Sequence, residues 1–170
     1  LNFHTNLVEK HSYSANPWSW LVLGRPTSFY YQSGDSCGAG ECAQEILAMG
    51  TPLLWWSAII AVAITLGFYL KTVNKSAEIV LAGFAGTYLP WFIFQDRTMF
   101  YFYSITTLPF LILALMYCFD LLLKYRNYQR VIQFFILIVA INFIYFLPIY
   151  IGIEIPYSHW LNRMWLPSWI

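Results

Sequence analysis

Two charged residues, Asp96 and Arg97, stand side by side in a short polar segment, residues 95–98, which joins two long apolar runs. A guanidinium forms paired hydrogen bonds with phosphate oxygens, so Arg97 is the first candidate for a phosphate contact. Aromatic residues crowd both sides of the segment, which is typical of a transmembrane hairpin that turns at the membrane surface. The alternative is that Arg97 only pairs with Asp96, or only extends to the headgroup level.

A second group of candidates lies near the beginning of the chain. Arg25 is the second candidate for a phosphate contact. The aromatic and imidazole side chains before it could form a binding surface for a flat polar ligand with an apolar side, such as a sugar: His11, Tyr13, Trp18 and Trp20. Simpler interpretations stay open, because paired tryptophans often anchor a chain at the membrane interface and a single histidine often serves as a structural hydrogen-bonding group.

Motifs of soluble enzymes are absent from the sequence, which contains no Gly-rich phosphate loop, no Gly-x-Ser-x-Gly and no His-Glu-x-x-His. The three histidines, His4, His11 and His159, do not have the spacing of zinc ligands, and we expect no metal site and no cofactor. The net charge of +1 gives no electrostatic reason to expect nucleic-acid binding.

The composition is that of a membrane protein. Hydrophobic residues make up 59% of the 170 residues and charged residues 10%, whereas soluble domains carry roughly 25% charged residues. Uncharged apolar stretches near the length of a membrane span predict four transmembrane helices, over residues 52–70, 79–94, 99–119 and 131–153. We expect Pro109 to kink the third helix, leaving the Ile105 carbonyl to nearby hydroxyl groups.

The segment before the first span, residues 1–51, is polar to mixed. Residues 18–23 are apolar but too short to cross a bilayer, and they suit an interfacial segment or a short strand. Turn-forming residues predict a loop over 32–40, and residues 41–49 are expected to form a short amphipathic helix. Cys37 and Cys42 could form a disulfide or remain two free thiols. The expected fold is therefore an all-α membrane protein with two parts, 1–51 and 52–170.

Basic residues predict the orientation of the spans. Five of them fall in the two loops that share one side of the membrane: Lys71, Lys75, Lys124, Arg126 and Arg130. The positive-inside rule places these loops in the cytoplasm of a multi-pass cell-membrane protein. Residues 1–51, the 95–98 hinge and the C-terminal tail are then expected to be extracytoplasmic.

Several sequence motifs, in the right order, resemble the C-terminal region of the protein O-mannosyltransferase family, and of its actinobacterial members in particular. The motifs are His-Ser-Tyr-Ser-Ala-Asn-Pro-Trp-Ser-Trp (11–20), Gly-Arg-Pro (24–26), Gln-Glu-Ile-Leu-Ala-Met-Gly-Thr-Pro (44–52), Tyr-Leu-Pro-Trp (88–91), Arg-Thr-Met-Phe-Tyr-Phe-Tyr (97–103) and Arg-Met-Trp-Leu-Pro-Ser-Trp-Ile (163–170). Together they extend over nearly the whole chain.

The resemblance implies a membrane glycosyltransferase of the GT-C type. Such enzymes take mannose from a polyprenyl-phosphate carrier and transfer it, with inversion, to Ser or Thr of exported proteins. Their catalytic acidic residues belong to a first outer loop, and no stretch of this chain corresponds to it. We therefore expect a C-terminal part that is inactive alone and works with the N-terminal remainder of the same enzyme. Its other partners would be membrane lipid, the polyprenyl-phosphate-mannose donor and exported acceptor proteins.

A second reading of the sequence is a non-catalytic transmembrane module, such as a lipid-carrier transporter or a scaffold subunit. It explains the spans equally well and accounts directly for the missing carboxylate loop. A third reading is a related GT-C enzyme with another sugar. The sequence upstream of Leu1 would separate the first two readings, and an assay with defined lipid-linked donors would separate the third.

Overall fold

A computed structural model of the protein describes residues 11–34, 40–126 and 128–170. Four helical stretches in this part are long and apolar enough to cross a membrane, which confirms the four spans. They are α3 (Pro52–Thr72), α4 (Lys75–Tyr88) with the 3-10 helix η1 (Leu89–Phe94), η2 (Tyr101–Thr107) with α5 (Leu108–Arg126), and α6 (Gln129–Ile151).

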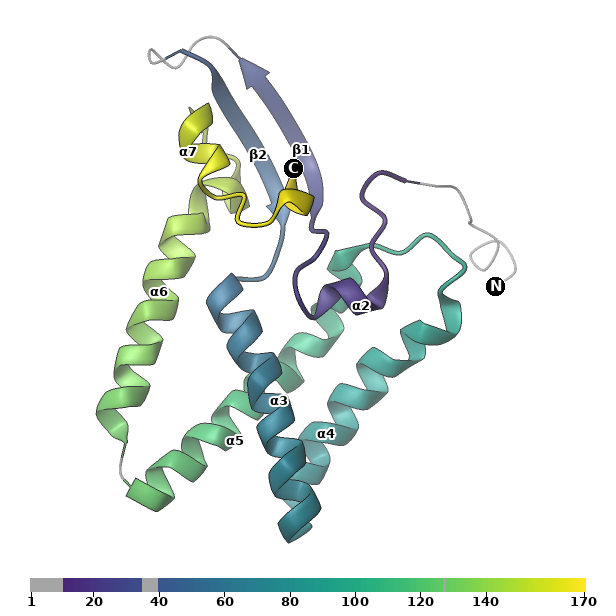
Figure 1. Ribbon diagram of the computed structural model, residues 1–170, viewed down its shortest axis with the longest axis vertical. Helices are drawn as coiled ribbons and strands as arrows, with labels where there is room; N and C mark the ends of the chain where they lie inside the picture. The colour runs from purple at the N-terminus through teal and green to yellow at the C-terminus, as the bar shows by residue number, and fades with distance from the viewer. Residues whose placement is uncertain (1–10, 35–39, 127) are drawn as a thin grey trace.

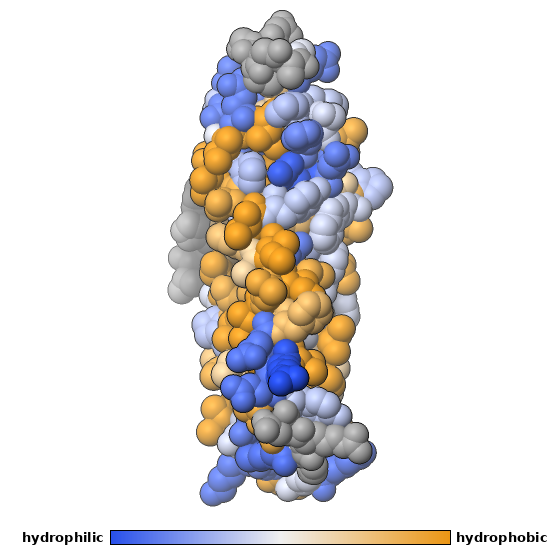
Figure 2. Space-filling view, turned by 90° about the vertical axis from the view of Figure 1, so that its left-hand side faces the viewer, coloured by the Kyte–Doolittle hydropathy of each residue, from blue (hydrophilic) through white to orange (hydrophobic). Residues whose placement is uncertain are grey.

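The helices α3, α4 and α5 pack on one another, while α6 leans away from them and meets a small sheet at its C-terminal end (Figure 1). All the basic loops lie at the opposite end of the bundle from the sheet. Hydrophobic residues run through the middle of the molecule, and hydrophilic residues gather toward its two ends (Figure 2). This distribution is the one expected of a bundle that crosses a bilayer.

The sheet has three antiparallel strands in the order β1 (Thr27–Gly34), β2 (Cys42–Ala48) and β3 (Ile155–Pro156). The amphipathic helix expected over 41–49 is therefore wrong, and the loop expected over 32–40 starts too early, because β1 continues to Gly34. Ala43, Glu45 and Leu47 of β2 are buried at every second position, which is strand periodicity. Pairing with β1 overrides the helix-forming residues of this segment.

Short helices complete this end of the molecule. Residues 17–20 form α2 (Pro17–Trp20) rather than a strand, because the Asn16 side chain accepts from the Trp18 amide and Pro17 suits a first helical turn. The C-terminal part holds α7 (Tyr157–Leu161) and η3 (Pro167–Trp169).

Pro109 does not kink a continuous helix. It occupies the second position of α5, where the chain changes from the 3-10 geometry of η2 to an α-helix. The Ile105 carbonyl accepts from the backbone N–H of Leu108, so it needs no hydroxyl partner. The nearby hydroxyl of Thr107 instead donates to the Ser104 carbonyl, at 2.7 Å. The prediction that nearby hydroxyl groups bond the Ile105 carbonyl is therefore wrong, because the backbone of the 3-10 turn supplies the hydrogen bond.

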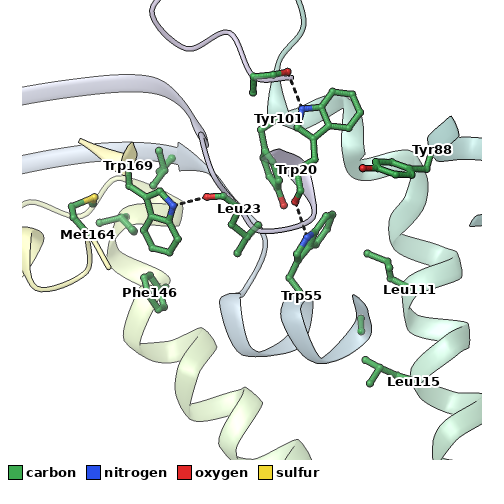
Figure 3. Close-up of a cluster of buried hydrophobic side chains, with 14 of the residues drawn as sticks. Trp20, Leu23, Trp55, Tyr88, Tyr101, Leu111, Leu115, Phe146, Met164 and Trp169 are labelled. Atoms are coloured by element: carbon green, nitrogen blue, oxygen red, sulfur yellow. Dashed lines mark hydrogen bonds between the residues drawn. The ribbon is translucent and has the colours of Figure 1, made fainter. Parts of the chain in front are cut away.

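Indole groups fasten the N-terminal segment to the bundle (Figure 3). Trp20 is fully buried and its Nε1 donates to the Ala15 carbonyl at 3.1 Å, while Trp55 of α3 donates to the Trp20 carbonyl at 3.0 Å. Trp169 of η3 donates to the Leu23 carbonyl from the other side. Buried indoles need such partners, and here the partners are backbone carbonyls of the segment 15–23, which contains α2 and its flanks. The N-terminal segment and the tail are thereby held at one end of the helices.

The two cysteines that the structure describes differ in their oxidation state. Cys42 is disulfide-bonded, and Cys118 in α5 is a free thiol. The other cysteine considered for a disulfide, Cys37, lies outside the described residues, as do His4 and the rest of 1–10.

Candidate functional site

A small polar cavity of about 160 Å³ lies beside the hinge between the second and third spans. It is lined by Ser14, Ala15, Asn16, Gln95, Arg97 and Met99. Residues from two distant parts of the chain therefore meet there: the segment before α2 and the 95–99 hinge. This is where the structure places the first candidate of the sequence analysis, Arg97.

Backbone and side-chain hydrogen bonds hold the two walls of the cavity together. The Ala15 N–H donates to the Met99 carbonyl at 2.7 Å, and the Asn16 amide donates to the Gln95 side-chain oxygen at 3.3 Å. The hinge itself is a tight turn, in which the Arg97 N–H donates to the Phe94 carbonyl at 3.2 Å. Arg97 thus lies on a turn whose residues before and after it are held by hydrogen bonds.

The guanidinium of Arg97 has unused hydrogen-bonding capacity. Its Nε is buried and has no hydrogen-bond partner among the described residues. Its central carbon lies 5.8 Å from the centre of the Tyr103 ring, a cation–π distance. Asp96 is exposed, and no ion pair joins it to Arg97 in the described part of the chain, where the ion pair observed is Lys124–Asp120. The alternative that Arg97 only pairs with Asp96 is therefore not what the geometry shows.

A buried donor without a partner is unfavourable by about 1–3 kcal/mol, and more when the group is charged. An anion in the cavity would supply the missing acceptor and would also compensate the charge. Among the residues that the structure describes, no carboxylate lines the cavity to compete for that place. The arrangement therefore suits a ligand with negatively charged oxygen atoms.

Arg25, the second candidate, is engaged in structure. Its Nη1 donates to the carbonyls of Ser168 and Ile170, the latter at 2.8 Å, and its Nε donates to the Ser12 carbonyl at 3.3 Å. Its guanidinium also lies 5.1 Å from the Tyr13 ring centre. These contacts tie the tail to the N-terminal segment and leave Arg25 less available to a ligand than Arg97.

The remaining candidates have different surroundings. His11 is exposed, its Nδ1 accepts from the Tyr13 N–H, and its ring meets the Phe100 ring edge-on at 5.2 Å. Trp18 is 67% exposed and packs edge-on against Phe92 at 4.6 Å. Both rings have surface free for a ligand at this end of the molecule.

The burial of Trp20 contradicts the site role expected for it from the sequence. Its ring is 0% exposed and lies in the core beneath α2, so it offers no face to a sugar or an acceptor. The two tryptophans of the 11–20 motif point to opposite sides of the short helix α2, which a linear sequence does not reveal. For Trp18 the role considered for the pair stays a prediction, and Trp20 is a structural residue.

Sequence reasoning missed the three uncharged polar residues of the wall, Ser14, Asn16 and Gln95. All three lie within segments already singled out, the 11–20 motif and the 95–98 hinge, but nothing in the sequence says that these segments touch. Their hydroxyl and amide groups can donate to or accept from the hydroxyls of a sugar or the oxygens of a phosphate.

The acidic residues near the sheet do not serve this cavity. Glu45 of β2 is buried and accepts a hydrogen bond of 2.6 Å from Trp160 Nε1. Its burial raises the pKa of the carboxyl, an effect only partly opposed by the hydrogen bonds from Trp160 and Ser28. We assign Glu45 to the packing of α7 on the sheet.

Four membrane spans, with a capping sheet and a cationic polar cavity at one end, define a multi-pass membrane protein. The family model described as the C-terminal four-transmembrane region of protein O-mannosyltransferase matches residues 1–78 and 68–169. The chain belongs to this family, and it is the family that the motifs of the sequence indicated.

Two bacterial relatives agree with this family assignment. The chain is 32% identical to a polyprenol-phosphate-mannose–protein mannosyltransferase of Mycolicibacterium smegmatis and 31% identical to one of Corynebacterium glutamicum, with 98% and 99% of the chain covered. It covers 35% of each of these relatives, so it spans about a third of their length.

A solved structure shares the fold. The match to the Saccharomyces cerevisiae protein O-mannosyltransferase Pmt1–Pmt2 complex bound to the sugar donor has a TM-score of 0.78 at 24% identity. It covers 99% of this chain and 25% of the yeast chain.

Proposed function

We propose that the chain is the C-terminal membrane region of an enzyme that transfers mannose from polyprenyl-phosphate-mannose to Ser or Thr residues of exported proteins. In this region Arg97 binds the phosphate of the donor. The observation that carries the proposal is the Arg97 guanidinium, which lines a polar cavity at the end of the spans with its Nε unpartnered among the described residues. The donor is the one named in the bacterial relatives.

The chemistry of mannosyl transfer explains why a cation belongs there. When the bond between the sugar carbon and the phosphate oxygen breaks, negative charge grows on the departing polyprenyl phosphate. A guanidinium already held in place stabilises that charge without reorganisation. Arg97 has this preorganisation, because the hinge is fixed by the bonds at Ala15 and Phe94.

The acceptor hydroxyl also needs a general base, and we assign this role to a part of the enzyme outside this chain. In the described part of the chain the Arg97 cavity has no carboxylate in its wall, and Glu45 is buried against Trp160. The chain therefore contributes the phosphate contact and a wall of the site, while the remainder of the enzyme contributes the base.

The cavity end of the bundle faces the exported side in this proposal. The N-terminal segment, the hinge and the tail are joined at that end by hydrogen bonds such as Ala15–Met99 and Trp169–Leu23. The basic loops occupy the other end, which the positive-inside rule assigns to the cytoplasm. Cysteine labelling from outside intact cells tests the sidedness: a cysteine at Asp96 is expected to react, and one at Lys71 is not.

The test of function is the Arg97→Ala variant of the full-length enzyme, assayed with a defined polyprenyl-phosphate-mannose donor and an acceptor peptide. Loss of one preorganised donor to a developing oxyanion reduces turnover by about 10²–10³-fold. Arg97→Lys keeps the charge but loses the forked geometry, so its turnover is expected to lie between those of the wild type and Arg97→Ala.

The matched control is Arg163→Ala, because Arg163 is also a half-buried arginine at this end of the molecule but its donors bind the carbonyls of Tyr145 and His159. We expect Arg163→Ala to lower stability more than turnover per folded molecule. Full turnover by a folded Arg97→Ala enzyme would refute the phosphate contact. Absence of mannosyl transfer by the full-length wild-type protein would favour the non-catalytic module instead.

A further inference from the structure

The hydrogen bonds of the hinge fix the backbone of Arg97, but they do not fix its guanidinium. Several rotatable bonds separate the two, and an arginine loses considerable rotamer entropy when its side chain is held in one place. Backbone carbonyls hold the side chain of Arg163, whose Nε and Nη1 donate to the carbonyls of Tyr145 and His159 at 2.7 and 2.6 Å. Among the described residues no carbonyl accepts from the Arg97 side chain, whose Nε is buried without a partner. A different contact is therefore needed to hold this guanidinium in one position.

The face of the Tyr103 ring supplies such a contact. The central carbon of the Arg97 guanidinium lies over this ring, 5.8 Å from its centre. A cation within about 6 Å of the ring centre is attracted by the negative face of an aromatic ring, and most strongly where water is excluded. Both side chains are half-buried. The Tyr103 N–H donates to the Phe100 carbonyl at 3.2 Å, so the backbone that carries the ring is itself held in a turn.

Two tryptophans connect the Tyr103 ring to the core of the molecule. Trp91 of η1 is stacked on Tyr103, with the ring centres 5.1 Å apart and the ring planes at 4° to one another. Trp20, which is fully buried, meets Trp91 edge-on at 5.6 Å. The indole of Trp20 donates to the Ala15 carbonyl (Figure 3), and the Ala15 N–H donates to the Met99 carbonyl in the wall of the polar cavity. The stack and the cavity wall are thus joined at both ends, which restricts the movement of the Tyr103 ring.

We infer that Tyr103 is a positioning residue, whose ring holds the Arg97 guanidinium in place for the donor's phosphate and is itself held by Trp91. This assignment rests on the proposed phosphate contact at Arg97. A cation–π contact suits the task, because it attracts the charge without using an N–H donor, and the donors stay free for phosphate oxygens. A carbonyl partner, such as those of Arg163, would occupy them. The inference also gives one role to two sequence motifs, 88–91 and 97–103, that contain these aromatic residues.

The first test removes the ring and measures mannosyl transfer by the full-length enzyme, with a polyprenyl-phosphate-mannose donor and an acceptor peptide. Tyr103→Phe keeps the ring and is expected to retain the kcat of the wild type. Tyr103→Leu removes it, and kcat is expected to fall about 5- to 30-fold, the range of a cation–π contact partly shielded from water. The matched control is Tyr145→Leu, because Tyr145 lies 4.7 Å from the Arg163 guanidinium and does not line the polar cavity. We expect Tyr145→Leu to leave kcat per folded molecule unchanged.

The second test separates positioning from packing by increasing fluorination of the ring in Tyr103→Phe. Fluorine withdraws electron density from the ring face and so weakens its attraction for a cation, while the ring stays available to stack on Trp91. The logarithm of kcat is therefore expected to fall step by step with fluorination. Packing alone predicts no such series. If Tyr103→Leu does not fold, the fluorinated series decides, because every member keeps an aromatic ring at this position.

A double-variant cycle separates this inference from the phosphate contact. In an Arg97→Ala background, Tyr103→Leu is expected to cause no further loss of kcat, because no guanidinium remains to be positioned. The same loss in both backgrounds, or equal kcat across the fluorinated series, would overturn the assignment. Either result together with low turnover of Arg97→Ala refutes the positioning role alone. Normal turnover of Arg97→Ala refutes the phosphate contact, and the positioning role with it.

Discussion

The contact between α4 and α5 gives a quantitative prediction for the variant Gly83→Ala. A Cβ atom at position 83 would lie 1.9 Å from Cε1 of Phe110 and 2.5 Å or less from two further atoms of its ring. Ordinary contacts begin at 3.4 Å, so the ring must move by about 1.5 Å, the difference between 3.4 and 1.9 Å. Small residues allow membrane helices to approach this closely, and Gly83 serves that purpose here.

The expected cost comes from comparison with a second glycine of the same helix. Overpacking costs about 1–3 kcal/mol. Gly86 has no atom within 4 Å of the equivalent added Cβ, so Gly86→Ala gains only the helix propensity of alanine. Both substitutions share that gain of about 1 kcal/mol, and it cancels in the difference. Gly83→Ala is therefore expected to be about 1–3 kcal/mol less stable than Gly86→Ala.

The assay is thermal unfolding of the detergent-solubilised full-length protein. Each kcal/mol shifts Tm by about 2–4 °C in a domain of 150–250 residues, and by less in a longer protein. The double variant Gly83→Ala, Phe110→Ala removes the ring and should lose much of the penalty that Gly83→Ala alone incurs, measured against Phe110→Ala as the background. Equal Tm values for Gly83→Ala and Gly86→Ala would refute the close packing. An unmeasurably unstable Gly83→Ala protein that the double variant rescues would support it.

Two further predictions concern the capping sheet and α2. Burial raises the pKa of Glu45, so the folded state favours the protonated carboxyl. The protonated carboxyl contributes fully to stability below the ordinary carboxyl pKa of about 4.3, and this contribution is lost as pH rises through the raised pKa. Glu45→Gln, which can still accept from Trp160, should flatten the dependence of Tm on pH in that window; a decline of unchanged size would refute the assignment. Trp20→Ala is expected to destabilise the protein by about 3–5 kcal/mol, while Trp18→Ala, with its ring 67% exposed, should change unfolding little. Equal losses in the two variants would contradict the difference in burial.

The membrane spans could be predicted from the sequence because the hydrocarbon core sets both their length and their composition. The predicted span over 131–153 corresponds to α6, Gln129–Ile151, and the other three agree to within a few residues. The strand β2 could not be predicted, since Glu45, Leu47 and their neighbours are good helix formers. Their strand conformation comes from backbone hydrogen bonds to β1, which no local pattern encodes.

The candidate site shows the same division. Arg97 could be singled out in the sequence, because a lone guanidinium between two spans must reach water or an anion. Its neighbours Asn16 and Ser14 could not, since about eighty residues separate them from the hinge. Likewise the sequence placed Trp18 and Trp20 together, and only the turn of α2 sends one to the surface and the other to the core.

By itself, then, the sequence determined the number of spans, the family and the cation at the hinge. These follow from local composition, from motifs and from the high energy of a charge in hydrocarbon. The tertiary structure alone decided that the N-terminal segment packs against the hinge, that Arg25 contacts the tail, and that Trp20 lies in the core. Such features depend on contacts between segments far apart in the chain, and their geometry is fixed only when the helices pack.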